Sequence, residues 1–146
     1  MFLKKMAVTV LAVVTVLSMS MTAFAAGSMS SVGGGGSVAG MNLAQTEANG
    51  DKWYVANDGT WKVVLADGSL AKGWQLLTWT WDGVTQQRWF FFNLENGNMV
   101  TGLTDVNGKT YYMNPVSDGL KGAMITGTVP VNGQTMSFAE TGELLN

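Results

Sequence analysis

Residues 89–102 read WFFFNLENGNMVTG, an aromatic run followed by a turn and then by a Gly-x-Met-x-Thr-Gly segment. Short aromatic runs that end near an Asn-Gly pair are typical of β-strands joined by tight turns, because such turns need residues that tolerate positive φ. The same order of features returns at residues 110–127, where TYYM leads to GAMITG, and weaker copies start at residues 61 and 135. The four copies start 28, 21 and 25 residues apart, which lies in the range of structural repeats. The sequence therefore predicts a protein built from repeated β-hairpins.

Turn signals continue on both sides of that stretch. Eight Asn-Gly or Asp-Gly pairs begin at residues 49, 58, 67, 82, 96, 107, 118 and 132. The apolar segments between them are short, and none shows the 3.6-residue period of an amphipathic helix. A single hairpin is only marginally stable in water, whereas stacked hairpins bury each other's aromatic faces. We therefore predict an all-β fold, a short solenoid of stacked β-hairpin repeats, with a compact sandwich as the alternative.

The composition divides the chain into three parts. Residues 1–25 are predicted to be a signal peptide, because two Lys residues precede an apolar run and Ala-Phe-Ala at 23–25 offers a cleavage site. The apolar run falls short of the roughly 20 residues that span a bilayer, which argues against a membrane anchor. Residues 26–50 are rich in Gly and Ser near their start and are predicted to be a flexible linker. Residues 51–146 then form the β-hairpin repeat module.

Charge and missing residue types exclude several functions. Removing residues 1–25 takes away two of the eight basic residues and none of the ten acidic ones, so the net charge becomes 6 − 10 = −4. A sparsely charged acidic chain is a poor ligand for nucleic acid or for anionic lipid, because their phosphates need Lys and Arg. The chain has neither Cys nor His, which removes disulfides, the commonest general base and the commonest metal ligand. We predict no nucleic-acid partner and no membrane association after removal of the signal peptide.

The acidic residues do not form a predicted catalytic or metal site. Most of them lie in or beside Asn-Gly or Asp-Gly turns, where Asp is favoured by turn geometry. No two carboxylates are placed as a glycosidase requires, and the calcium-like start at residues 105–108 lacks the later ligands of a calcium loop. No catalytic residue, metal or cofactor is predicted, and binding is favoured over an enzymatic function.

Residues 89–102 and 111–127 also carry a family resemblance. Their Gly-x-Met-x-Thr-Gly frames follow aromatic strands, and this pattern resembles the bacterial cell-wall-binding repeats, also called choline-binding or glucan-binding repeats. The resemblance extends over residues 53–145. It implies a secreted, cell-wall-associated bacterial protein that attaches without catalysis to cell-wall polysaccharide, either choline-bearing, as in teichoic acid, or glucan-like. In that family, choline lies in a cage of aromatic side chains between consecutive hairpins.

Departures from the family pattern confine the predicted binding site to the N-terminal repeats. The family's Trp after Thr-Gly is Leu103 in one repeat and Thr128 in the next, and the leading Trp is replaced by Thr110 and Thr135. The C-terminal repeats are therefore predicted to be structural. The predicted ligand-binding residues are Trp61, Trp74, Trp79, Trp81, Trp89 and Tyr112.

Strand alternation assigns several of these rings to opposite faces of a hairpin. Trp79 and Trp81 share one face of their strand, and Trp74 lies on the other face. In the next strand, Trp89 faces away from its neighbour Phe90. Because both faces are apolar, one can pack in the core while the other presents rings to a ligand. The alternative for each ring is that it only fills the core between hairpins.

A structural or interaction protein is the alternative function. The hairpins would then self-associate with other copies or pair with a protein partner through their open strand edges, which are sites of β-pairing. The loss of the Gly-Trp pairs from the last two repeats favours this alternative, and the tryptophan cluster favours ligand binding.

Overall fold

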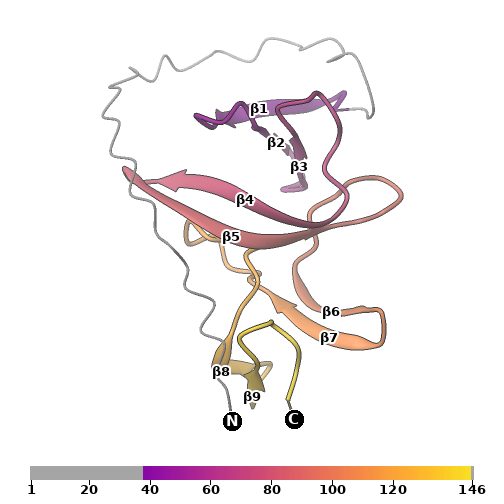
Figure 1. Cartoon of the computed structure of the whole chain (residues 1–146), viewed down its shortest axis with the longest axis vertical. Helices are drawn as coiled ribbons and strands as arrows, with labels where there is room; N and C mark the ends of the chain where they lie inside the picture. Colours follow the sequence, from indigo (N-terminus) through magenta and orange to yellow (C-terminus); the bar gives the residue numbers. More distant parts are fainter. Residues whose placement is uncertain (1–37, 146) are drawn as a thin grey trace.

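The computed structural model describes residues 38–145, and this part of the chain forms nine β-strands (Figure 1). The predicted signal peptide and the first part of the predicted linker lie outside the described residues. No helix within residues 38–145 is long and apolar enough to cross a membrane. The strands are β1 (Met41–Thr46), β2 (Lys52–Ala56), β3 (Trp61–Val64), β4 (Gly73–Trp81), β5 (Val84–Phe92), β6 (Gly102–Val106), β7 (Lys109–Met113), β8 (Gly127–Val131) and β9 (Gln134–Phe138).

All pairing is antiparallel and between neighbours in the sequence. The sheets are β1-β2-β3, β4-β5, β6-β7 and β8-β9, and Figure 1 shows them following one another in chain order along the longest axis. The β4-β5 hairpin is the longest, with nine residues in each strand. The prediction of an all-β fold made of hairpin repeats is confirmed.

The Asn-Gly and Asp-Gly pairs form two kinds of turn. Asp82, Asn107 and Asn132 have φ between 49° and 51° and each precedes a Gly of positive φ, as two-residue hairpin turns require. These three pairs close β4-β5, β6-β7 and β8-β9. The other five pairs have positive φ only at Gly, and the preceding Asn or Asp side chain accepts a hydrogen bond from the N–H two residues later. The turn predicted at each pair is therefore a two-residue hairpin turn at three positions, and at the other five positions the Asn or Asp side chain closes the turn.

One connecting segment after each hairpin joins it to the hairpin before. After the second strand, the chain turns and forms a single antiparallel bridge with that strand's last residue, as in Phe92 with Met99. The bridging residue also donates its N–H to a carbonyl of the preceding hairpin. These inter-hairpin hydrogen bonds run from Met99 to Trp61 (2.8 Å), from Met124 to Trp89 (2.8 Å) and from Leu144 to Thr110 (2.7 Å).

The glycine two residues before each bridging residue packs against the previous repeat. A Cβ placed on Gly122 would lie 2.3 Å from Met99 Sδ, and one on Gly142 would lie 2.2 Å from Met124 Sδ. Gly97 has the same relation to Leu70, at 2.5 Å from its Cδ2. The repeated Gly-x-Met pattern therefore reflects the stacking of the repeats, in which each apolar bridging residue packs against the glycine of the next repeat.

The boundary of the predicted linker is corrected at its C-terminal end. Residues 41–46 were expected to be linker but form β1, which pairs with β2 along its length. Val38 and Met41 are buried against Tyr54, in a cluster at the N-terminal end of the array. Burial of Val38 and Met41 against Tyr54 of β2 stabilises this segment as part of the sheet, although its local composition by itself favours a coil.

Candidate functional site

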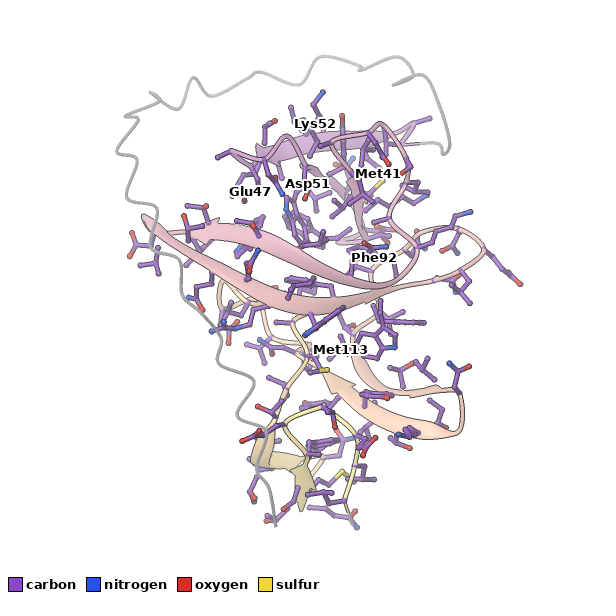
Figure 2. The ribbon with its side chains drawn as sticks, in the orientation of Figure 1. Met41, Glu47, Asp51, Lys52, Phe92 and Met113 are labelled. Atoms are coloured by element: carbon purple, nitrogen blue, oxygen red, sulfur yellow. The ribbon has the colours of Figure 1, made fainter. Side chains whose placement is uncertain are left out.

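A groove of about 670 Å³ lies between the first sheet, the outer part of β4 and a loop from the third hairpin. Figure 2 shows the side chains that fill the layer between β1-β2-β3 and the β4-β5 hairpin, with Glu47 and Asp51 labelled there. The groove is lined mainly by aromatic side chains, with polar groups at its rim. Its lining consists of Ala44, Gln45, Trp53, Trp61, Trp79, Thr80, Trp81, Asp82, Phe90, Met99, Ser117, Gly119 and Lys121.

Three indole rings meet nearly edge to face inside this groove. The ring centroids of Trp53 lie 6.3 Å from Trp61 and 4.9 Å from Trp79, and those of Trp61 and Trp79 are 5.8 Å apart. The interplanar angles of 65° to 87° turn the rings into walls of different orientation. The ring centroid of Phe90 lies 5.1 Å from that of Trp53. Such walls attract a quaternary ammonium group through cation–π interactions, and flat indole faces also stack on sugar rings.

Trp81 extends the aromatic surface toward solvent. Its ring stacks on Trp79 with centroids 6.4 Å apart and an interplanar angle of 15°, and 56% of the residue is exposed. Gly119 lies directly against it, since a Cβ there would be 2.5 Å from Cδ1 of Trp81. The extra length of β4 and β5 carries this ring out to the groove mouth.

A buried carboxylate fixes the part of β4 that carries these rings. Glu47 is 5% exposed and accepts hydrogen bonds from the N–H of Thr80 (3.0 Å) and from its hydroxyl (2.9 Å). Gln45 donates to Glu47 and also to the carbonyl of Thr80 (3.0 Å). Because Thr80 lies between Trp79 and Trp81, these bonds set the position of both rings relative to the first sheet.

Replacing Glu47 by Ala should lower the free energy of unfolding by about 2 kcal/mol, because the part-buried N–H of Thr80 loses its acceptor and the Thr80 hydroxyl keeps only Thr85 as a side-chain partner. Chemical denaturation measures this change. The matched control is Glu140→Ala, which removes an exposed carboxylate from a turn and should leave the midpoint unchanged. Equal stability of the two variants would show that the carboxylate does not hold the β4 strand.

The loop between β7 and β8 supplies the far wall of the groove. Bridge partners are six or seven residues apart in the other three repeats, whereas Met113 and Met124 are eleven apart. The additional residues bring Ser117, Gly119 and Lys121 into the lining. A loop from the repeats that were predicted to be structural therefore contributes to the lining of the groove. The longer spacing was visible in the sequence and was the signal for it.

The six predicted binding residues separate into three groups. Trp61, Trp79 and Trp81 line the groove together with Trp53, which the sequence analysis omitted although it begins an aromatic pair in β2. The alternation predicted for β4 is confirmed, because Trp74 faces away from them. Trp74 and Trp89 form the second group, which packs with Phe91 and Tyr111 on the opposite face of the β4-β5 hairpin. Tyr112 alone is the third group, and its ring stacks on Phe138.

The inter-hairpin hydrogen bonds show which positions correspond between repeats. Trp61, Trp89 and Thr110 each accept the bond from a bridging residue. The first two positions therefore carry indole rings, and the third carries a small hydroxyl side chain. This explains why indole rings lie on either side of β4-β5, whereas the third hairpin carries no indole at this position.

The charged groups of the groove are sparse. The lining includes the carboxylate of Asp82 and the ammonium of Lys121. Among residues 38–145, no group of three or more Asp or Glu side chains is placed to hold a metal ion. The groove therefore offers aromatic contact and a few polar groups at its rim.

Comparison with known proteins identifies structural neighbours. No protein-family model matches the chain, and no curated protein does. A pneumococcal cell-wall endolysin from phage Cp-1, solved in complex with choline, is similar with a TM-score of 0.52 and 21% identity over 72% of this chain. The same endolysin in complex with a peptidoglycan analogue gives a TM-score of 0.51 and 22% identity over 72% of this chain. CbpJ from Streptococcus pneumoniae matches 70% of this chain at 23% identity with a TM-score of 0.45.

The matched parts are fragments of these neighbours. They cover 27% of the endolysin chain and 41% of CbpJ. The resemblance predicted from the sequence is confirmed at the level of the fold: the described part of this chain has the hairpin-repeat fold of the matched part of the choline-bound endolysin.

Proposed function

We propose that the protein is an exported, noncatalytic module that attaches to bacterial cell-wall carbohydrate by binding a quaternary ammonium group in the aromatic groove. The observation that carries this proposal is the groove wall formed by the partly exposed rings of Trp61 and Trp79, which meet at 87°, and by the exposed ring of Trp81. Perpendicular walls present several π-faces to one small cation, and each contact contributes about 0.5–2 kcal/mol.

The electrostatic surroundings support a cation in the groove. The carboxylate of Asp82 lines the groove, and the buried carboxylate of Glu47 lies behind Thr80 on the same side. Both contribute negative potential where a cation would sit, and burial of Glu47 reduces the screening of its charge. The structural neighbour from phage Cp-1 was solved with choline, which is the reason for testing this cation first.

The test is calorimetric titration with choline and with 3,3-dimethyl-1-butanol, which has the same shape without the charge. Cation–π attraction predicts that choline binds at least about tenfold more tightly than the neutral compound. Soluble glucan is the third ligand. Equal affinity for choline and the alcohol, or binding of glucan alone, would contradict recognition of the ammonium group.

Attachment to the envelope is tested with purified cell walls. We expect the protein to be retained by choline-bearing walls, to be released by free choline, and not to be retained by walls stripped of teichoic acid. Retention that free choline does not reverse would argue for a different cell-wall ligand.

A structural role is the second candidate, and one observation favours it for the C-terminal repeats. Hairpins β6-β7 and β8-β9 keep the inter-hairpin hydrogen bond at Thr110 but lack the indole found at the corresponding positions. Self-association through these hairpins would appear as a concentration-dependent mass in sedimentation equilibrium. A choline-independent oligomer that binds no ligand in the titrations would favour the structural function over the binding function.

A further inference from the structure

A second hollow adjoins the aromatic groove at Trp61. Its volume is about 220 Å³, and it shares Trp61, Met99 and Lys121 with the groove. The shared lining places the two spaces next to each other, so one ligand can contact both. The remaining lining of the second hollow is Asp58, Gly59, Thr60, Asn98 and Thr101.

Three successive repeats build this hollow. The turn between β2 and β3 supplies residues 58–60, the segment after β5 supplies residues 98–101, and the loop after β7 supplies Lys121. The hydrogen bond from Met99 to the Trp61 carbonyl fixes the first two pieces to each other at 2.8 Å. The hollow is thus a feature of the stacked array and of no single hairpin.

The polar side chains of the hollow are available to a ligand. Within residues 38–145, the side chains of Asn98, Thr101 and Lys121 make no hydrogen bond to the protein, and no carboxylate lies within 4.0 Å of the Lys121 ammonium. Asp58 accepts a hydrogen bond from the Thr60 N–H (2.9 Å). This bond, together with one from the Thr60 hydroxyl, lowers the pKa of Asp58, so its carboxylate is ionised at neutral pH.

These groups suit hydroxyl groups better than an anion. A carboxylate, an amide, a hydroxyl and an ammonium together accept and donate hydrogen bonds in several directions, as a sugar ring requires. A phosphate would gain from Lys121 but would be repelled by Asp58 in the same small space. A sugar hydroxyl donates to the carboxylate and accepts from the ammonium without that conflict.

We propose that the second hollow is a saccharide subsite, which binds hydroxyl groups of a sugar that carries the quaternary ammonium held in the aromatic groove against Trp61, Trp79 and Trp81. The inference rests on the proposed function, because it takes the aromatic groove as the ammonium site. It makes the ligand one molecule with two parts, an ammonium group and a sugar ring joined closely enough to span Trp61. The affinity of the whole protein for wall fragments then comes from both spaces.

The test compares choline with N,N,N-trimethylglucosaminium, a sugar ring that bears its own trimethylammonium group, by calorimetry on the full chain. We expect the sugar compound to bind about tenfold more tightly, since two additional hydrogen bonds form. The double variant Asn98→Ala, Thr101→Val should remove that advantage and leave choline affinity within about twofold of the parent. The matched control is Thr135→Val, an exposed threonine of β9, which should change neither affinity.

Each other outcome counts against the inference. Equal affinity for the two compounds, or an advantage that survives in the double variant, would overturn the saccharide subsite while leaving ammonium binding intact. Tighter binding of phosphocholine than of the sugar compound, lost in Lys121→Met, would replace it by an anion subsite. Absence of binding by choline and by the sugar compound would overturn the proposed function together with this inference.

Discussion

Replacing Trp61 by Ala is expected to weaken choline binding by about 30-fold, which corresponds to a loss of about 2 kcal/mol. Trp61 is a wall of the aromatic groove and also of the adjoining hollow, so its removal opens both spaces to solvent. Its ring is only partly buried, unlike that of Trp53, which is 2% exposed and belongs to the core. The loss should therefore appear mainly in binding, and calorimetric titration with choline measures it.

The control for that variant is Trp89→Ala. Trp89 occupies the position in the second hairpin that Trp61 occupies in the first, because both carbonyls accept an inter-hairpin hydrogen bond. It faces the opposite side of β4-β5, against Trp74. Choline binding in the Trp53-containing groove should survive its removal. A Trp61→Ala protein that is folded and binds choline with unchanged affinity would show that the groove is not the ammonium site.

Replacing Gly122 by Ala should lower the free energy of unfolding by about 3 kcal/mol. The residue has φ of +85°, which costs a residue with a Cβ of the order of 1–3 kcal/mol, and the new methyl would lie 2.3 Å from Met99 Sδ. Met99 cannot move aside freely, because its N–H bonds to the Trp61 carbonyl and its side chain packs against the buried cluster that includes Trp53 and Phe90. Thermal unfolding followed by circular dichroism should show a midpoint lower by more than about 10 °C, as expected for a domain of this size.

Gly133→Ala separates the backbone cost from the packing cost. Gly133 has φ of +80°, close to that of Gly122, but a Cβ there would have nothing within 4 Å. Its substitution should be the milder of the two by the energy of the Met99 overlap. The double variant Met99→Ala, Gly122→Ala should recover part of the loss, because the clash is relieved while the strain remains. Equal destabilisation by Gly122→Ala and Gly133→Ala would show that the repeats do not stack through this contact.

The repeat is the feature of the fold that the sequence predicts best. Gly97 and Gly122 occupy the same place in two Gly-x-Met-x-Thr-Gly frames, and the structure gives that pattern one local reason in both copies. Positive φ and close packing on the preceding bridging residue each require Gly, so the shared spacing of Gly in the two frames is enough to predict these positions. The alternation of Trp74 and Trp79 along β4 was predictable for a similar reason, since neighbouring side chains of a strand point to opposite faces.

The composition of the binding site was less predictable. Trp53 and Trp61 belong to the first sheet, and Trp79 meets them in a layer where Glu47 also fixes the adjacent Thr80 from 33 residues away. Tyr112 resembles the other candidates in type and spacing, yet it stacks on Phe138 in the C-terminal part of the array. Residue type and alternation indicate which face a ring occupies, but the rotation of one hairpin on the next decides which rings meet.

The sequence by itself determined that the chain turns back at short intervals, that its strands carry aromatic faces and that its repeats resemble cell-wall-binding hairpins. These properties depend on the φ preferences of Gly and Asn and on side-chain type, which act over a few residues. Only the tertiary structure decided that β1 joins the first sheet, that the loop after β7 closes the groove and that the six predicted rings divide among three places. Those outcomes depend on contacts between residues far apart in the chain, whose energies are set by packing and buried hydrogen bonds and are invisible in any short window of sequence.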